Sequence, residues 1–174
     1  MITKPLSNEY LPTAHQYICL VPNGDLLDIL RNQHVQSYLL LGNLSEEQAQ
    51  YQYAEGKWTI KSVVGHIADV ERLWNYRIFR IVRGDTRELP AYNRDTFAKL
   101  APFDGMVLAD VLEDLSAVRK STLTLLGNLH EEALLRCGEY NDYSLSARAA
   151  AFIIAGHEIH HMNVIKSKYL SQMN

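Results

Sequence analysis

The chain has 174 residues, a length that fits a single domain over 1–174 more easily than two domains. Apolar residues make up 47% of it and charged residues 21%, which is ordinary for a globular protein. The net charge of −3 excludes a strongly basic nucleic-acid binder, and no apolar run is long enough to span a membrane. With two cysteines and no secretory signal, we expect a cytoplasmic protein without disulfides.

The first half of the chain carries two long helical patterns. Residues 1–23 contain three prolines and are predicted to form an extended leader that packs on a helical body. Apolar residues at helical spacing predict a helix over 25–41, and a capping-box pattern over 45–48 predicts a short helical turn. A second long helix is expected from Thr59, whose hydroxyl can cap the free amides, until Gly84.

The second half adds two more long helices. Residues 85–106 hold two prolines and a glycine, and we expect a long connection that forms a lid or rim. The third helix is predicted from a cap near Asp104 to Gly127, and the fourth from a cap at Ser144, after a polar loop, to about Leu170. No segment alternates with period two, so no strand is predicted. The sequence therefore predicts an all-α four-helix bundle with a leader and a long connection between helices two and three.

The histidines are the main chemical signal. His157 and His161 are four residues apart, so both imidazoles project from one face of the last helix, whereas His160 is rotated by about 100° from His161. His66 falls on the inward stripe of the second long helix and is the best third ligand, with His34 in reserve. The alternative is that these histidines are hydrogen-bonded core residues.

The segment 157–161 also matches the H-E-x-x-H signature of metalloproteases. No third ligand follows this helix in the sequence, which argues against a protease.

Three segments, taken together and in order, resemble the DinB-like superfamily, which includes the YfiT family of metal-dependent hydrolases. They are YAEGKWTI at 53–60, GHIADVER at 65–72 and GHEIHH at 156–161. The resemblance covers nearly the whole chain. Val70 stands where the family usually has Thr, and Asn93 stands where an Asp is common, which bears on substrate choice.

The resemblance implies a four-helix bundle with one divalent ion, Zn or Ni, held by His66, His157 and His161. An ion with three imidazole ligands keeps open positions and can activate water, so we expect a hydrolase acting on a small-molecule substrate. The alternatives are a transferase of a low-molecular-weight thiol, and a non-catalytic metal-binding or stress-related binding module. The family also implies a homodimer, for which we expect exposed apolar residues such as Trp74 and Phe79.

Two carboxylates near His66 are candidate catalytic residues. Asp69 lies one helical turn from His66, whereas Glu71 points away from it. Either carboxylate could instead form an ion pair with Arg72 or Arg77.

The arginines at 77, 80 and 83 nearly share one helical face and could hold the carboxylates of a thiol. The alternative is a solvated edge of the second helix. Cys19 and Cys137 show no activating pattern and are not expected to act as nucleophiles.

Overall fold

A computed structural model describes residues 1–85 and 87–173. Four long helices dominate it, which confirms the predicted four-helix bundle: α2 (Leu26–Leu41), α4 (Ile60–Val82), α6 (Leu108–Gly127) and α8 (Ala147–Val164). None of the helices in this described part combines the length and apolar character needed to cross a bilayer.

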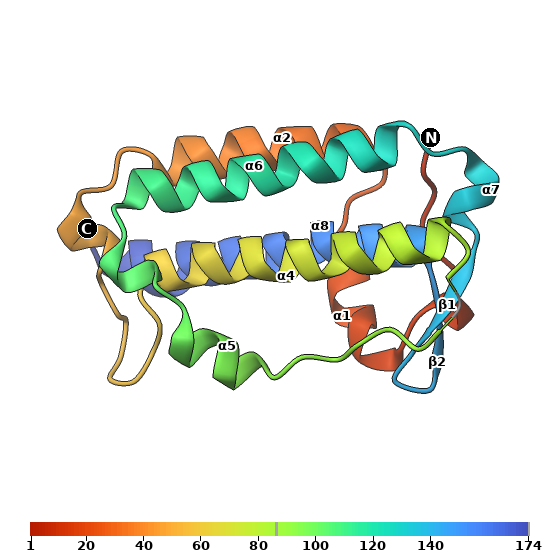
Figure 1. Cartoon of the computed structure of the whole chain (residues 1–174). Helices are drawn as coiled ribbons and strands as arrows, with labels where there is room; N and C mark the ends of the chain where they lie inside the picture. The colour runs from red at the N-terminus through yellow and green to blue at the C-terminus, as the bar shows by residue number, and fades with distance from the viewer. Residues whose placement is uncertain (86, 174) are drawn as a thin grey trace.

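The four helices are arranged in two layers (Figure 1). Helices α2 and α6 form one layer and α4 and α8 the other, and each helix packs against two of the others, in the order α2, α6, α4, α8. Figure 1 also shows that α4 and α6, which are consecutive long helices, run in the same direction. The connection between them therefore returns along the whole bundle, which explains why it is long.

Smaller elements cover the far side of the α4–α8 layer (Figure 1). They include α1 (His15–Ile18) and α5 (Arg94–Leu100), while α3 (Glu46–Ala49) and α7 (Glu131–Leu134) lie near the two ends of the bundle. The remaining helical turns are Ser7–Glu9, Pro12–Ala14, Phe103–Gly105 and Leu170–Gln172, with a π turn at Ile165–Tyr169. The first 23 residues thus contain three short helical pieces and are not simply extended, and the predicted connection holds a helix of its own.

The start of α4 is capped as the sequence predicts, but the start of α6 is not. The Thr59 hydroxyl accepts a hydrogen bond from the Ser62 amide at 3.0 Å. Asp104 does not cap α6, because its carboxylate accepts hydrogen bonds from the hydroxyls of Thr59 and Ser62. Helix α6 begins four residues later at Leu108, whose amide donates to the carboxylate of Glu46. Asp104 therefore hydrogen-bonds to the start of α4 and not to the start of α6.

A β-hairpin replaces the polar loop expected before the last helix. Strands β1 (Cys137–Tyr140) and β2 (Tyr143–Ser146) pair antiparallel. Between them Asn141 and Asp142 have φ angles of 51° and 64°, as in the two-residue turns typical of tight hairpins. Ser144 lies within the ladder, and the cap of α8 is Ser146, which accepts from the Ala149 amide.

The leader is tied to the start of α8 by a partly buried ion pair. The Glu9 carboxylate accepts hydrogen bonds from the Ser146 hydroxyl and from Arg148 Nε, both at 2.7 Å. Burial raises the pKa of Glu9, but hydrogen bonds from Arg148, Leu6 and Ser146 outweigh it and hold the pKa at about 2. The carboxylate is therefore ionised at neutral pH, and the leader forms part of the folded body.

The apolar core consists of two clusters, one toward each end of the bundle. One contains Leu30 and Phe152, and the other contains Ile67 and Leu115. Trp74, which was expected on the surface, belongs to the first cluster with 8% exposure. Its place on the inner stripe of α4 explains this burial.

Candidate metal centre

Three histidines from two helices converge on one point. His66 on α4 and His157 and His161 on α8 offer nitrogen atoms that all lie within 4.8 Å of one another. The Nε2 atoms of His157 and His161 are 3.1 Å apart, and the His66 ring centroid lies 5.1 Å and 5.0 Å from theirs. The α4–α8 contact thus brings together the histidines that the two helical stripes singled out.

Burial keeps these imidazoles neutral. It lowers the pKa of His66 to about 4, with a smaller contribution from Arg94, and it lowers the pKa of His161 to about 3. The pKa of His157 lies well below its usual value, because this residue is buried and the other histidines are close. Neutral imidazoles present lone pairs, which is the form that binds a metal ion.

The donor set fits a divalent ion. Two nitrogens bound to one tetrahedral Zn²⁺ lie roughly 3.4 Å apart, given Zn–N bonds of about 2.0–2.1 Å. The nitrogens of His157 and His161 are 3.1 Å apart, and all three ligand nitrogens lie within 4.8 Å of one another. These distances bracket roughly 3.4 Å, so small side-chain rotations would bring the three nitrogens into the geometry of a tetrahedral ion. Among the described residues this group has three members, and a site with three protein ligands leaves coordination positions open.

The histidines line a cavity of about 330 Å³ between the α4–α8 layer and the elements that cover it. Aromatic rings form much of its wall: Tyr17 contacts His157 at a centroid distance of 5.5 Å, and Trp58 contacts His66 at 4.9 Å. The lining comprises Leu11, Thr13, Ala14, Gln16, Tyr17, Trp58, His66, Val70, Trp74, Tyr92, Arg94, Tyr140, Ile153, His157, His160 and His161. A cavity of this size, lined by aromatic and aliphatic side chains together with convergent polar groups, is typical of a small-molecule site.

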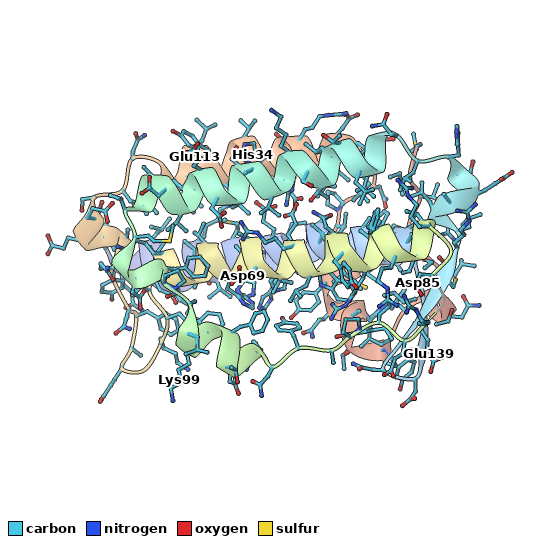
Figure 2. The ribbon with its side chains drawn as sticks, in the orientation of Figure 1. His34, Asp69, Asp85, Lys99, Glu113 and Glu139 are labelled. Atoms are coloured by element: carbon cyan, nitrogen blue, oxygen red, sulfur yellow. The ribbon has the colours of Figure 1, made fainter. Side chains whose placement is uncertain are left out.

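The two candidate carboxylates lie in different places. Asp69, which lies on α4 (Figure 2), is half-buried and, with His66, lines a small neighbouring cavity. It forms a 3.4 Å ion pair with Arg72. Burial raises the pKa of Asp69, an effect that Arg72 opposes. Among the described residues no hydrogen bond joins Asp69 to His66. Glu71 lies inside the bundle, away from the histidines, with 2% exposure.

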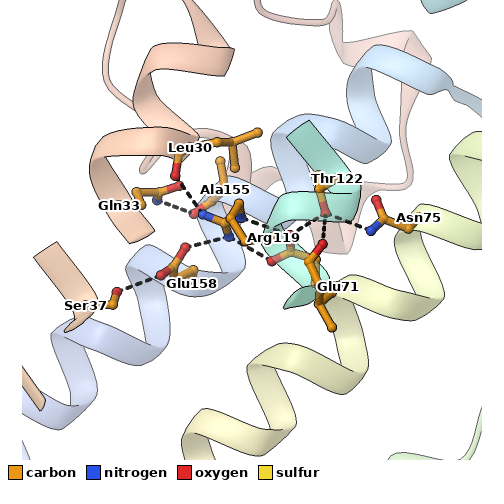
Figure 3. A network of polar contacts seen from close by, with 10 residues as sticks. Leu30, Gln33, Ser37, Glu71, Asn75, Arg119, Thr122, Ala155 and Glu158 are labelled. Carbon is orange, nitrogen blue, oxygen red and sulfur yellow. Dashed lines mark hydrogen bonds and ion pairs between the residues drawn. The ribbon is translucent and has the colours of Figure 1, made fainter. Parts of the chain in front are cut away.

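Glu71 belongs to a buried polar network that the sequence did not reveal (Figure 3). Arg119 on α6 donates to Glu71 through Nε and Nη2, at 2.9 and 2.7 Å, and to Glu158 through Nη2 at 2.7 Å. Ser37 donates to Glu158 at 2.6 Å, and Thr122 also donates to Glu71. Burial lowers the pKa of Arg119, but the two carboxylates outweigh it and raise this pKa above its usual value.

This network joins all four long helices, because it also includes α2 through the Ser37 hydroxyl and the Leu30 carbonyl. Glu158 directly follows the site residue His157, so the network fixes the α8 backbone beside the histidines. The sequence did carry one indication of this network. Arg119 and Thr122 fall on the apolar stripe of the third long helix, and polar residues in a buried position need hydrogen-bond partners.

The three arginines at 77, 80 and 83 share neither a ligand-binding face nor a solvated edge, because each has its own environment. Arg77 is 1% exposed, and its guanidinium lies 4.4 Å and 4.2 Å from the ring centroids of Trp74 and Tyr140. Arg80 pairs with Asp85 at 2.8 Å, and Arg83 lies over the Phe79 ring.

Arg94, which sequence reasoning missed, lines the histidine cavity from α5. Asn93 caps that helix by accepting from the Thr96 amide at 2.9 Å.

The other histidines lie outside the cluster. His34 is on the opposite layer of the bundle, 3.2 Å from the Ser116 hydroxyl, and cannot complete the group (Figure 2). His160 lines the cavity, with its ring centroid 5.0 Å from that of His161. His15 and His130 are exposed, and His15 lies between the Tyr10 hydroxyl and the Cys19 thiol, 3.1 Å from each.

Comparison with known proteins agrees with this architecture. A sequence model of the DinB superfamily matches residues 30–165. The chain belongs to the DinB superfamily. This DinB-type chain is similar to the Oceanobacillus iheyensis protein named "Putative metal-dependent hydrolase OB0413", with 25% identity over 129 residues that cover 72% of this chain and 73% of the relative.

The fold is similar to a solved structure. YfiT from Bacillus subtilis, described as "a probable metal-dependent hydrolase with an unusual four-helix bundle topology", superposes with a TM-score of 0.76 at 18% identity. The match covers 88% of this chain and 93% of YfiT. The DinB-type bundle thus extends over most of the chain, including the helices that carry the three histidines.

Proposed function

We propose that this protein is a metal-dependent hydrolase in which His66, His157 and His161 bind one divalent ion, Zn or Ni. The observation that carries the proposal is the convergence of three neutral, largely buried imidazoles at the wall of a 330 Å³ cavity. The relative named as a metal-dependent hydrolase supports the same reaction class. The substrate is a small molecule, because the cavity is of small-molecule size.

The bound ion would supply Lewis-acid chemistry, lowering the pKa of a bound water toward about 7 and polarising a carbonyl group. The chain's own residues prepare the site for this chemistry. Trp58 and Tyr17 pack on the imidazoles of His66 and His157, which fixes the ring orientations and excludes water from their flanks. The network behind α8 holds the backbone of the ligand-bearing turn in place.

His160 is the group best placed to move a proton. It is half-buried, lines the cavity and lies beside His161 without belonging to the three-nitrogen cluster. His160→Gln is expected to lower kcat by about 10²–10⁴, the usual contribution of a general acid or base, with metal content unchanged.

The catalytic roles of Asp69 and Glu71 remain predictions. Glu71 is buried in an ion pair with Arg119 and Asp69 is half-buried beside Arg72, which favours positioning roles for both. Asp69→Asn and Glu71→Gln test these roles through kcat.

The first experiment measures the metal content of untagged protein. We expect about one Zn or Ni per chain in the wild type, and loss of this metal in His66→Ala and His157→Ala. His34→Ala is the matched control, because it removes an imidazole from the opposite layer. Wild type that binds neither metal, even after incubation with Zn²⁺ or Ni²⁺, would refute the proposal. Metal-loaded protein is then screened for hydrolysis of small esters and amides.

A thiol transferase is the second candidate. The specific observation in its favour is that no carboxylate lines the cavity among the described residues, which leaves His160 as the candidate base for an attacking water. Transfer of a thiol bound as thiolate at the ion needs no such base. Adding a low-molecular-weight thiol and an electrophile to the metal-loaded protein separates the two candidates, since only the transferase consumes the thiol stoichiometrically.

We also propose a cytoplasmic homodimer. Tyr76 and Phe79 are neighbours on the outer face of α4 with 50% and 47% exposure, and they support a contact surface there. Light scattering coupled to size exclusion is expected to give a dimer mass for wild type and a monomer mass for Phe79→Glu.

A further inference from the structure

The lining of the histidine cavity carries a cation but no acidic side chain among the described residues. Arg94 is the charged side chain in the lining, and no aspartate or glutamate takes part among the described residues. The chain as a whole has 20 acidic residues against 17 Lys and Arg, so its composition does not explain this absence. An adjoining opening of about 380 Å³ shares Arg94 and adds Lys57 as a cation and Asp95 as an acid.

A second cation lies directly behind the cavity wall. The Arg77 guanidinium stacks on Trp74 and Tyr140, and both rings line the cavity. It donates to the Pro90 carbonyl at 2.8 Å and to the Tyr140 hydroxyl at 3.3 Å, but its Nη1 is buried without a hydrogen-bond partner. No carboxylate pairs with Arg77 in the described part of the chain. Its charge is therefore compensated only by aromatic faces and neutral oxygens.

Such an arrangement favours an anion in the cavity. Burying a charge without a counter-ion costs free energy. An anion in the cavity would lower this cost, because water in a low-dielectric cavity screens the charge less than bulk water does. Arg94 is better placed to touch a ligand, since it is exposed at the rim and holds Asp95 only loosely, at 3.4 Å. The planar fork of an arginine matches a carboxylate.

We propose that the substrate is a small carboxylic acid with a flat apolar body, whose carboxylate is bound by Arg94 while its body lies against Trp74 and Tyr140. This inference rests on the proposed function and specifies the substrate class of the same cavity. The reacting group would then face the histidines, with the carboxylate at the α5 rim.

The chain offers a direct readout of binding. It contains two tryptophans, Trp58 and Trp74, and both line the cavity. Metal-loaded protein is titrated with 3-phenylpropionate and with 3-phenylpropanamide, which have nearly the same shape and differ in charge, and tryptophan fluorescence is followed. We expect the acid to bind about tenfold more tightly than the amide, as for a charge-assisted contact.

The variant Arg94→Gln is expected to reduce this preference by about fivefold, with metal content unchanged. Lys99→Gln is the matched control: it removes the same charge from the same helix at an exposed position outside the cavity lining (Figure 2), and the preference is expected to persist. Equal affinities for acid and amide in wild type would overturn the proposal. An unchanged preference in Arg94→Gln would also overturn it, since the ion alone would then select the anion.

Two further arms complete the test. Tighter binding of phenyl phosphate than of the acid would overturn the assignment to a carboxylate. Ester hydrolysis is measured in parallel: hydrolysis without acid preference refutes this inference alone, whereas acid preference without hydrolysis supports it and counts against the hydrolase proposal.

Discussion

Gly156 lies where α1 of the leader contacts α8, the helix that carries His157 and His161. Replacing Gly156 with alanine tests that contact. A Cβ atom built on Gly156 lies 2.0 Å from the Tyr17 carbonyl oxygen, 2.4 Å from its carbon and 2.9 Å from its Cα. These are backbone atoms of α1, so no side-chain rotation relieves the overlap. Because ordinary contact begins near 3.4 Å, α1 must move away from α8 by roughly 1.4 Å.

The size of the effect follows from two opposing contributions. Overpacking in a close-packed interior costs about 1–3 kcal/mol, and a backbone clash belongs at the upper end of this range. The higher helix propensity of alanine offsets about 1 kcal/mol of this cost, because alanine loses less conformational entropy than glycine when the helix forms. We expect Gly156→Ala to lower the free energy of unfolding by about 2 kcal/mol, which for a chain of this length corresponds to a Tm decrease of about 4–8 °C.

The assay is urea unfolding followed by tryptophan fluorescence and by circular dichroism. Gly127→Ala makes the same substitution at the last residue of α6, where a Cβ meets nothing within 4 Å, and it should leave stability unchanged or slightly higher. Displacement of α1 also moves Tyr17 away from His157, so metal affinity should fall in Gly156→Ala only. Equal stability of the two variants would refute the reasoning, since α1 would then not be held against α8.

Three further predictions concern the buried network, the leader and the metal. Arg119→Met leaves two buried carboxylates unpaired and should lower the free energy of unfolding by about 3–5 kcal/mol. The control Arg72→Met breaks exposed ion pairs and should lower it by about 1 kcal/mol or less. Equal losses of stability for the two variants in denaturant melts would contradict a buried network. The depressed pKa of Glu9 stabilises the fold fully above pH 4.5, and this contribution is lost as pH falls toward 2. Wild type should therefore exceed Glu9→Gln in unfolding free energy by about 2 kcal/mol at pH 7, and an undiminished gap at pH 2.5 would exclude the ion pair as its source. Chelation of Zn²⁺ held at 100-fold above its Kd should remove about 2.7 kcal/mol of stability from wild type and nothing from His66→Ala, as measured by thermal melts.

Local sequence patterns determined the helices and part of the site. Thr59 and Gly84 bound the second long helix because capping and chain reversal depend on residues within one turn. The pairing of His157 with His161 follows from the 3.6-residue helical repeat alone. By contrast, the Asn141–Asp142 turn carried a hairpin signal that a search for long alternation overlooked.

The tertiary structure decided which faces meet. His66 and His34 both lie near inner stripes of long helices, and only the packing of α4 beside α8 brings His66 to the other two histidines. In the same way, Arg119 finds Glu71 and Glu158 across helices that are distant in sequence. Helical periodicity gives the direction of a side chain relative to its own axis, whereas its neighbours depend on how the bundle closes, and closure is set by the summed burial of all four helices.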